Sequence, residues 1–98
     1  MVTENTSENV KAHVVVIGLV QEVGFRYFTA RLAEQHGLNG WVRNTPDSKV
    51  EIEVEGDRGL VESFIKEVNI GPTSGHVAGM DVTWNTYTGG YEDFRVRL

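Results

Sequence analysis

The chain has 98 residues and a formal net charge of −5, with 40% hydrophobic and 23% charged residues. That length supports one modest hydrophobic core and therefore a single domain. The acidic charge argues against a general nucleic-acid binder, which needs a basic face to neutralise phosphates. The absence of cysteine excludes disulfides and thiolate metal sites.

The sequence shows no sign of a metal site, a membrane span or a signal peptide. His13, His36 and His76 are scattered without metal-ligand spacing, so we expect no metal and no other cofactor. No apolar run approaches the roughly 18 residues that a membrane span requires, and the first nine residues are polar and acidic, unlike a signal peptide. We expect a disordered tail over 1–9, a folded domain over 10–98, and a cytoplasmic monomer without membrane or nucleic-acid partners.

Periodic hydrophobic patterns predict seven elements along the domain. In chain order they are a strand over about 10–17, a helix over 25–36, strands over 40–44 and 50–55, a helix from 56–57 to about 70, and strands over 77–86 and 94–98. Phe25, Phe28 and Leu32 share one face of the first helix. Strict alternation of apolar and acidic residues over 50–55 predicts one buried and one solvated acidic face. Met80, Val82 and Trp84 alternate with polar residues, and we expect them in the core.

This order of elements matches an α+β, ferredoxin-like fold. In that arrangement two helices pack on one face of an antiparallel sheet, here with a short extra C-terminal strand. The helical crossover makes the first two strands run in the same direction, with the third between them. The ends of those strands, at Gly18 and Asn44, should therefore lie at the same edge of the sheet.

The loop over 18–26 is the most informative segment. A glycine-flanked loop between a strand and a helix exposes backbone N–H groups at the helix start, which suits an anion. Arg26 adds a planar, permanently charged fork that matches phosphate geometry. The loop therefore predicts a phosphate site.

Two segments resemble the motifs of the acylphosphatases, small enzymes that hydrolyse carboxyl-phosphate anhydrides. The first resembles the family pattern Gly-x-Val-Gln-Gly-Val-x-Phe-Arg, met by Gly18, Val20, Gln21, Val23, Phe25 and Arg26. The second is similar to a strand and turn motif, met by Gly40, Trp41, Val42, Arg43, Asn44, Val50 and Gly56. The resemblance extends over about 10–98, the whole predicted domain.

The resemblance implies a mechanism without metal or cofactor. Arg26 would grip the phosphate of a small acyl phosphate, and Asn44 would orient a water for in-line attack. The loop backbone would complete the phosphate cradle, through Val20, Gln21, Glu22, Val23, Gly24 and Phe25. The leaving carboxylate has a conjugate acid with a pKa of roughly 4, so its departure needs no general acid.

The chain departs from the family pattern at two glycine positions, which Glu22 and Ser48 occupy. If either position requires a positive φ, a residue with a Cβ costs on the order of 1 kcal/mol. A Glu22 carboxylate aimed into the cradle would repel phosphate by about 3 kcal/mol. The same carboxylate pointing into water would have little effect, and we favour that orientation.

Two further interpretations stay open, and Glu22 supports the first of them. One is a catalytically weak ferredoxin-like module that binds phosphate or a protein. The other is an acylphosphatase-like domain of a larger carbamoyl-transfer enzyme. Comparing acyl-phosphate hydrolysis by the native chain and by Glu22→Gly separates an active enzyme from a weak module.

Overall fold

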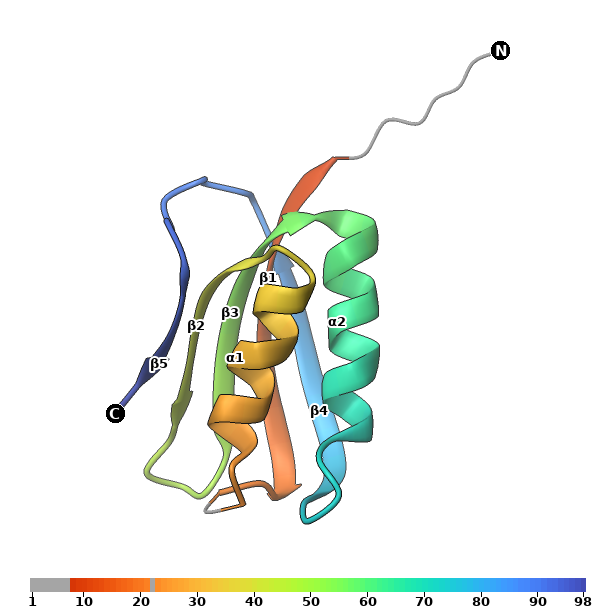
Figure 1. Ribbon diagram of the computed structural model, residues 1–98, viewed down its shortest axis with the longest axis vertical. Coiled ribbons are helices and arrows are strands. Elements are labelled where there is room, and N and C mark those ends of the chain that lie inside the picture. Colours follow the sequence, from red (N-terminus) through yellow and green to blue (C-terminus); the bar gives the residue numbers. More distant parts are fainter. Residues whose placement is uncertain (1–7, 22) are drawn as a thin grey trace.

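The computed structural model describes residues 8–21 and 23–98, which form a five-stranded sheet and two helices (Figure 1). The elements are β1 (Asn9–Leu19), α1 (Phe25–Gln35), β2 (Asn39–Asn44), β3 (Val50–Asp57), α2 (Arg58–Ile70), β4 (His76–Asn85) and β5 (Phe94–Arg97). β1 begins at Asn9, inside the expected tail. The rest of the tail prediction, over residues 1–7, lies outside the described residues, as does Glu22.

The strand order is β4-β1-β3-β2-β5, and the first four strands have the predicted ferredoxin-like arrangement. β3 lies between β1 and β2 and is antiparallel to both, so β1 and β2 run in the same direction. β5 pairs in parallel with β2, which makes the sheet mixed where we predicted an antiparallel one. The reason is the route of the chain, because β4 ends at the end of the sheet where β2 begins, and the chain crosses there to the far edge and turns back, so β5 runs in the direction of β2 (Figure 1).

Both helices cover one face of the sheet (Figure 1). Apolar side chains spaced along each helix meet the inward side chains of the strands, which is the amphipathic pattern of a two-layer domain. The buried helix residues are Phe25, Thr29, Leu32 and Ala33 of α1 and Val61, Phe64 and Val68 of α2. No helix in the described ranges is long and apolar enough to cross a membrane.

β4 is less buried than its pattern predicted. Met80 packs against the core, but Val82 and Trp84 are 37% and 40% exposed, so the prediction of core positions was wrong for these two. They oppose the buried Val14 and Ala12 of β1, yet they lie on an edge strand that the helices cover only in part. The Trp84 ring is shielded by the Arg58 guanidinium, 4.7 Å from its centroid.

The acidic face of β3 is also more covered than predicted. Glu55 is only 3% exposed, because the segment after β4 crosses this face and caps its carboxylate. Thr88 donates to Glu55 from its backbone N–H, at 2.8 Å, and from its hydroxyl, at 2.7 Å. The prediction of a solvated face therefore fails at Glu55, because its partners lie more than 30 residues away in the sequence.

Candidate active site

Three segments meet at one end of the sheet, the lower end in Figure 1: the loop after β1, the start of α1 and the end of β2. They meet because β1 and β2 run in the same direction on either side of β3. The prediction that the strand ends share one sheet edge is thus confirmed. Gly18 is required near this point, because a Cβ there would lie 2.2 Å from the carbonyl oxygen of His76 on the neighbouring strand.

A small cavity of about 110 Å³ lies where these segments meet. Its lining consists of Val20, Gly24, Phe25, Arg26, Tyr27 and Asn44. Both predicted catalytic residues and three of the predicted loop residues therefore surround one space. Gln21 and Val23 do not line it, and Tyr27 is a neighbour that the sequence did not single out.

The N-terminus of α1 opens into this cavity. Gly24 is the N-cap residue, with a left-handed φ of 74° that glycine adopts without strain. The first intrahelical hydrogen bond is from the Phe28 N–H to the Gly24 carbonyl, at 2.9 Å. Among the described residues, no side chain caps the helix and no acidic residue lies in its first turn. The helix start therefore keeps free N–H donors and a positive partial charge for an anion.

Arg26 is held at the second position of this helix. One of its terminal nitrogens, Nη1, donates to the carbonyl oxygen of Arg97 on β5 at 3.1 Å. In the part of the chain that the structure describes, no carboxylate pairs with this guanidinium. Because a guanidinium carries five N–H donors, the group keeps donors for a ligand after this anchoring bond.

Asn44 supplies a polar group of a different kind. Its carbonyl oxygen, Oδ1, is buried and has no hydrogen-bond partner within the described ranges. An unsatisfied buried acceptor costs about 1–3 kcal/mol, and native proteins usually satisfy it with water or a ligand. The oxygen is therefore ready to accept a hydrogen bond from a molecule in the cavity.

The side chain of Gln21 faces the turn that follows Asn44. Its Nε2 donates to the Thr45 carbonyl at 2.9 Å and to the Lys49 carbonyl at 2.8 Å. In the same turn Ser48 has a φ of 69°, the left-handed conformation anticipated where the family pattern has glycine. The sequence predicted Gln21 as part of the loop, but nothing in its spacing pointed to Thr45 and Lys49.

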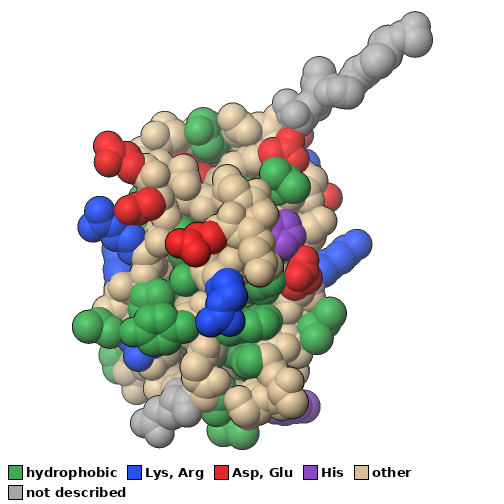
Figure 2. Space-filling view, viewed as in Figure 1, with side chains coloured by type: hydrophobic (Ala, Val, Ile, Leu, Met, Phe, Trp, Pro, Cys, Tyr) green, Lys and Arg blue, Asp and Glu red, His purple; other side chains and the backbone are tan. Residues whose placement is uncertain are grey.

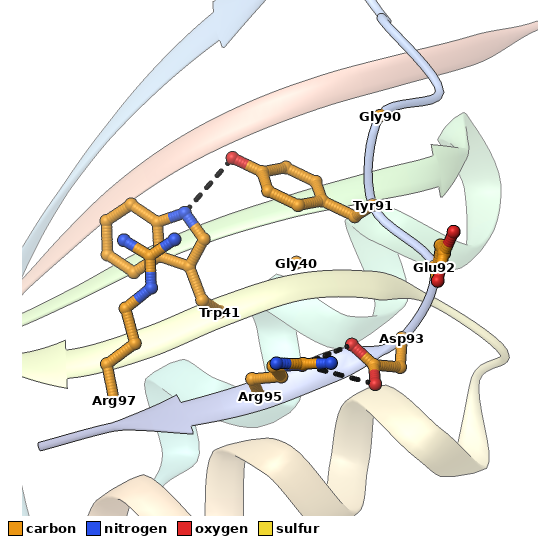
Figure 3. A pocket seen from close by; sticks show the side chains of 8 residues that line it. All are labelled: Gly40, Trp41, Gly90, Tyr91, Glu92, Asp93, Arg95 and Arg97. Atoms are coloured by element: carbon orange, nitrogen blue, oxygen red, sulfur yellow. Dashed lines mark hydrogen bonds and ion pairs between the residues drawn. The ribbon is translucent and has the colours of Figure 1, made fainter.

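A larger cavity of about 280 Å³ lies on the other face of the sheet (Figure 3). The Arg97 guanidinium stacks over the Trp41 ring at 4.4 Å, and the Trp41 indole donates to the Tyr91 hydroxyl at 3.1 Å. Burial, together with the hydrogen bond to Glu53, raises the pKa of Tyr91. This cavity has neither a helix N-terminus nor Asn44, and Glu92 and Asp93 line it, so it suits a phosphate less well.

Among the described residues, the acidic side chains in Figure 2 lie mainly over the upper and middle parts of the helix side. Within residues 8–21 and 23–98, no group of three or more His, Asp or Glu side chains could hold a metal ion. The site thus offers hydrogen-bond donors, a guanidinium and an amide.

Known proteins show the same combination of sequence and fold. The Acylphosphatase family model matches residues 12–96. An acylphosphatase of Chlorobaculum tepidum is 46% identical over 74% of this chain and 78% of its own, and one of an Anaeromyxobacter species is 41% identical over 93% and 98%. The crystal structure of acylphosphatase from Bacillus subtilis superposes with a TM-score of 0.88 at 35% identity, covering 91% of this chain and 99% of that one. Full-length HypF, in a phosphate- and nucleotide-bound form, matches 97% of this chain with 12% of its own, at 28% identity and a TM-score of 0.82. On these matches, together with the two motifs, the chain belongs to the acylphosphatase family.

Proposed function

We propose that Arg26, the N-terminus of α1 and Asn44 together hydrolyse the carboxyl-phosphate bond of acyl phosphates. As a member of the acylphosphatase family, the chain acts on small acyl phosphates. The observation that carries the proposal is that the start of α1, Arg26 and the Asn44 oxygen line one cavity, and that among residues 8–21 and 23–98 the helix start has no side-chain cap, the arginine no acidic partner and the Asn44 oxygen no hydrogen-bond partner.

The phosphate end of the substrate binds at the start of α1. The free N–H groups of the first turn donate to phosphoryl oxygens, and Arg26 donates from the nitrogens that Arg97 leaves free. As the transferring phosphoryl group spreads its charge over these oxygens, donors that are already oriented stabilise the transition state more than water would.

Asn44 orients the nucleophile. Its Oδ1 accepts a hydrogen bond from a water molecule, and its amide N–H₂ donates to a phosphoryl oxygen. The water oxygen attacks phosphorus, the bond from phosphorus to the acyl oxygen breaks, and the carboxylate leaves with the electron pair. The proton of the water passes to a phosphate oxygen, so the products are carboxylate and inorganic phosphate. Positioning and charge stabilisation suffice because the leaving group is weakly basic.

The alternative of a catalytically weak binding module depends on Glu22. The identity of 41% over nearly the full length of an acylphosphatase favours the enzyme. High turnover of acetyl phosphate by the native chain would rule out the weak module, whereas turnover by Glu22→Gly alone would support it. The proposal also keeps the expectation of a cytoplasmic monomer, and light scattering of the purified protein tests its monomeric state.

Two substitutions test the proposed site. Arg26→Ala should lower the kcat/KM for acetyl phosphate by at least about 10³-fold, because it removes the positive charge that stabilises the phosphoryl oxygens. Asn44→Ala should lower kcat by about 10²-fold while the inhibition constant of inorganic phosphate rises by no more than about fivefold, because Asn44 acts chiefly on the water and its loss removes one neutral hydrogen bond to phosphate, worth about 1 kcal/mol. Phosphate release without added metal measures both effects.

Matched controls are available on the helices. Arg31→Ala changes an exposed arginine of α1, and Asn69→Ala changes an exposed asparagine of α2, and both should keep normal turnover. Near-normal turnover by Arg26→Ala would contradict the proposal. So would a loss of activity in Arg31→Ala as large as that in Arg26→Ala.

A further inference from the structure

The Gln21 side chain connects the two halves of the candidate site. It extends from the loop after β1 and donates two hydrogen bonds, of 2.9 and 2.8 Å, to carbonyl oxygens of the turn between β2 and β3. Both acceptors are carbonyls, so only the nitrogen end of the carboxamide fits between them. Leucine, methionine or glutamate at this position could not make either bond.

The turn that receives these bonds is closed by its own contacts. The Thr45 N–H donates to the Lys49 carbonyl at 2.9 Å, and the Lys49 N–H donates to the Thr45 hydroxyl at 3.0 Å. These bonds hold the turn together, but they do not set its position relative to the phosphate loop. The Gln21 bonds do, and one of their acceptors belongs to the residue directly after Asn44.

We propose that Gln21 is a positioning residue that sets the distance between Asn44 and the phosphate held at the start of α1. The inference rests on the proposed function, because it assigns Gln21 a part in aligning the attacking water. In-line attack is sensitive to such alignment, and a displacement of about 1 Å can cost about 10²-fold in rate. The Gln21 side chain acts without touching phosphate, because it does not line the cavity.

The test compares Gln21→Met with Gln35→Met. Methionine keeps the length of the side chain and removes its donors, and Gln35 is an exposed glutamine of α1 that serves as the matched control. With acetyl phosphate as substrate, Gln21→Met should lower kcat by about ten- to a hundredfold. The inhibition constant of inorganic phosphate should stay within twofold. Gln35→Met should change neither quantity.

A double-mutant cycle separates positioning from a general structural effect. In an Asn44→Ala background, Gln21→Met should lower kcat by less than twofold, because no oriented amide remains to be misplaced. The same factor in both backgrounds would overturn the inference, and so would an inhibition constant that rises in step with the loss of kcat. Full turnover by the single variant Asn44→Ala would instead contradict the proposed function itself, so the two failures can be told apart.

A measurement on the unmodified protein covers the case in which Gln21→Met does not fold. Inorganic phosphate is titrated into ¹⁵N-labelled protein while the amide resonances are followed by NMR. The backbone amides of Phe25 and Arg26 should shift strongly, whereas the side-chain amide of Gln21 should shift much less. A Gln21 side-chain shift as large as that of Phe25 would indicate direct phosphate contact and would overturn the inference.

Discussion

Arg26 stands in the first turn of α1, where the positive end of the helix dipole disfavours a cation. The cost is typically 0.3–1 kcal/mol, and an anion bound at the same place reverses its sign. Meanwhile the Arg97 carbonyl restrains the guanidinium before any ligand arrives. A position that is unfavourable in the free protein and favourable with bound phosphate is what preorganised transition-state stabilisation requires.

Thr29 is a second residue whose local cost can be measured. It is fully buried in α1, and its hydroxyl has no hydrogen-bond partner among the described residues. Thr29→Val replaces that hydroxyl with a methyl group of similar size and should raise the free energy of unfolding by about 1 kcal/mol. Urea denaturation measures the change. Thr29→Ser keeps the hydroxyl but loses a methyl group, so it should be destabilising by about 1 kcal/mol. Destabilisation by both variants would mean that the hydroxyl is satisfied in solution.

In the turn between β2 and β3, the backbone conformation of one residue lowers the stability of the protein. Ser48 is the one non-glycine residue with a positive φ in the described part of the chain, at 69°. Ser48→Gly should stabilise the protein by about 0.5–1 kcal/mol, because relief of the left-handed strain exceeds the added entropy of the unfolded chain. Thermal unfolding measures the gain. Ser63→Gly, at an exposed position of α2, should have the opposite sign, because glycine disfavours helix. A loss of stability in Ser48→Gly would show that the serine side chain stabilises the turn.

Elements defined by local pattern were predictable, and those defined by distant partners were not. Periodicity predicted the helix over 25–36 and the strand over 50–55, within two residues of the observed Phe25–Gln35 and Val50–Asp57. The crossover correctly placed Asn44 beside the loop. The exposure of Trp84 depends on how far the helices extend across an edge strand, and the hydrophobic period of that strand does not indicate this. The Gln21 contacts likewise span 24 and 28 residues, so no local pattern reveals them.

At the scale of the whole molecule, the two faces of the sheet differ in what they carry. The face that the helices cover carries the core and the candidate site (Figure 1). On the opposite face, Glu51, Glu53 and Glu55 of β3 pair with basic side chains. Lys11 lies 3.5 Å from Glu55, and His13 and Arg43 each hydrogen-bond Glu51 at 2.6 Å. The hydrogen bond from His13, followed by that from Arg43, keeps the pKa of Glu51 below its ordinary value. Carboxylates bound in this way couple folding to pH.

Glu55 should contribute to that coupling, because it is only 3% exposed and its carboxylate accepts hydrogen bonds from Thr88 and Gly89. Burial raises its pKa, but hydrogen bonds from Thr88 and the charge of Lys11 outweigh burial and hold the pKa below its ordinary value of 4.5. A carboxylate that binds protons less readily in the folded state stabilises fully above that value, and its contribution is lost as the pH falls below it. Glu55→Gln should therefore lower the free energy of unfolding by about 1–3 kcal/mol at neutral pH, because a carboxamide cannot accept every one of these bonds.

The same substitution should flatten the acid limb of the stability curve. Urea denaturation between about pH 5 and pH 3 should show the native protein losing stability steeply and Glu55→Gln losing less, so that the two curves converge at the acid end. Glu34→Gln, at an exposed position of α1, should keep the native slope. Parallel curves for the native protein and Glu55→Gln would assign the acid sensitivity to other carboxylates, with Glu51 the first to examine because its pKa is lowered by two partners on the same face.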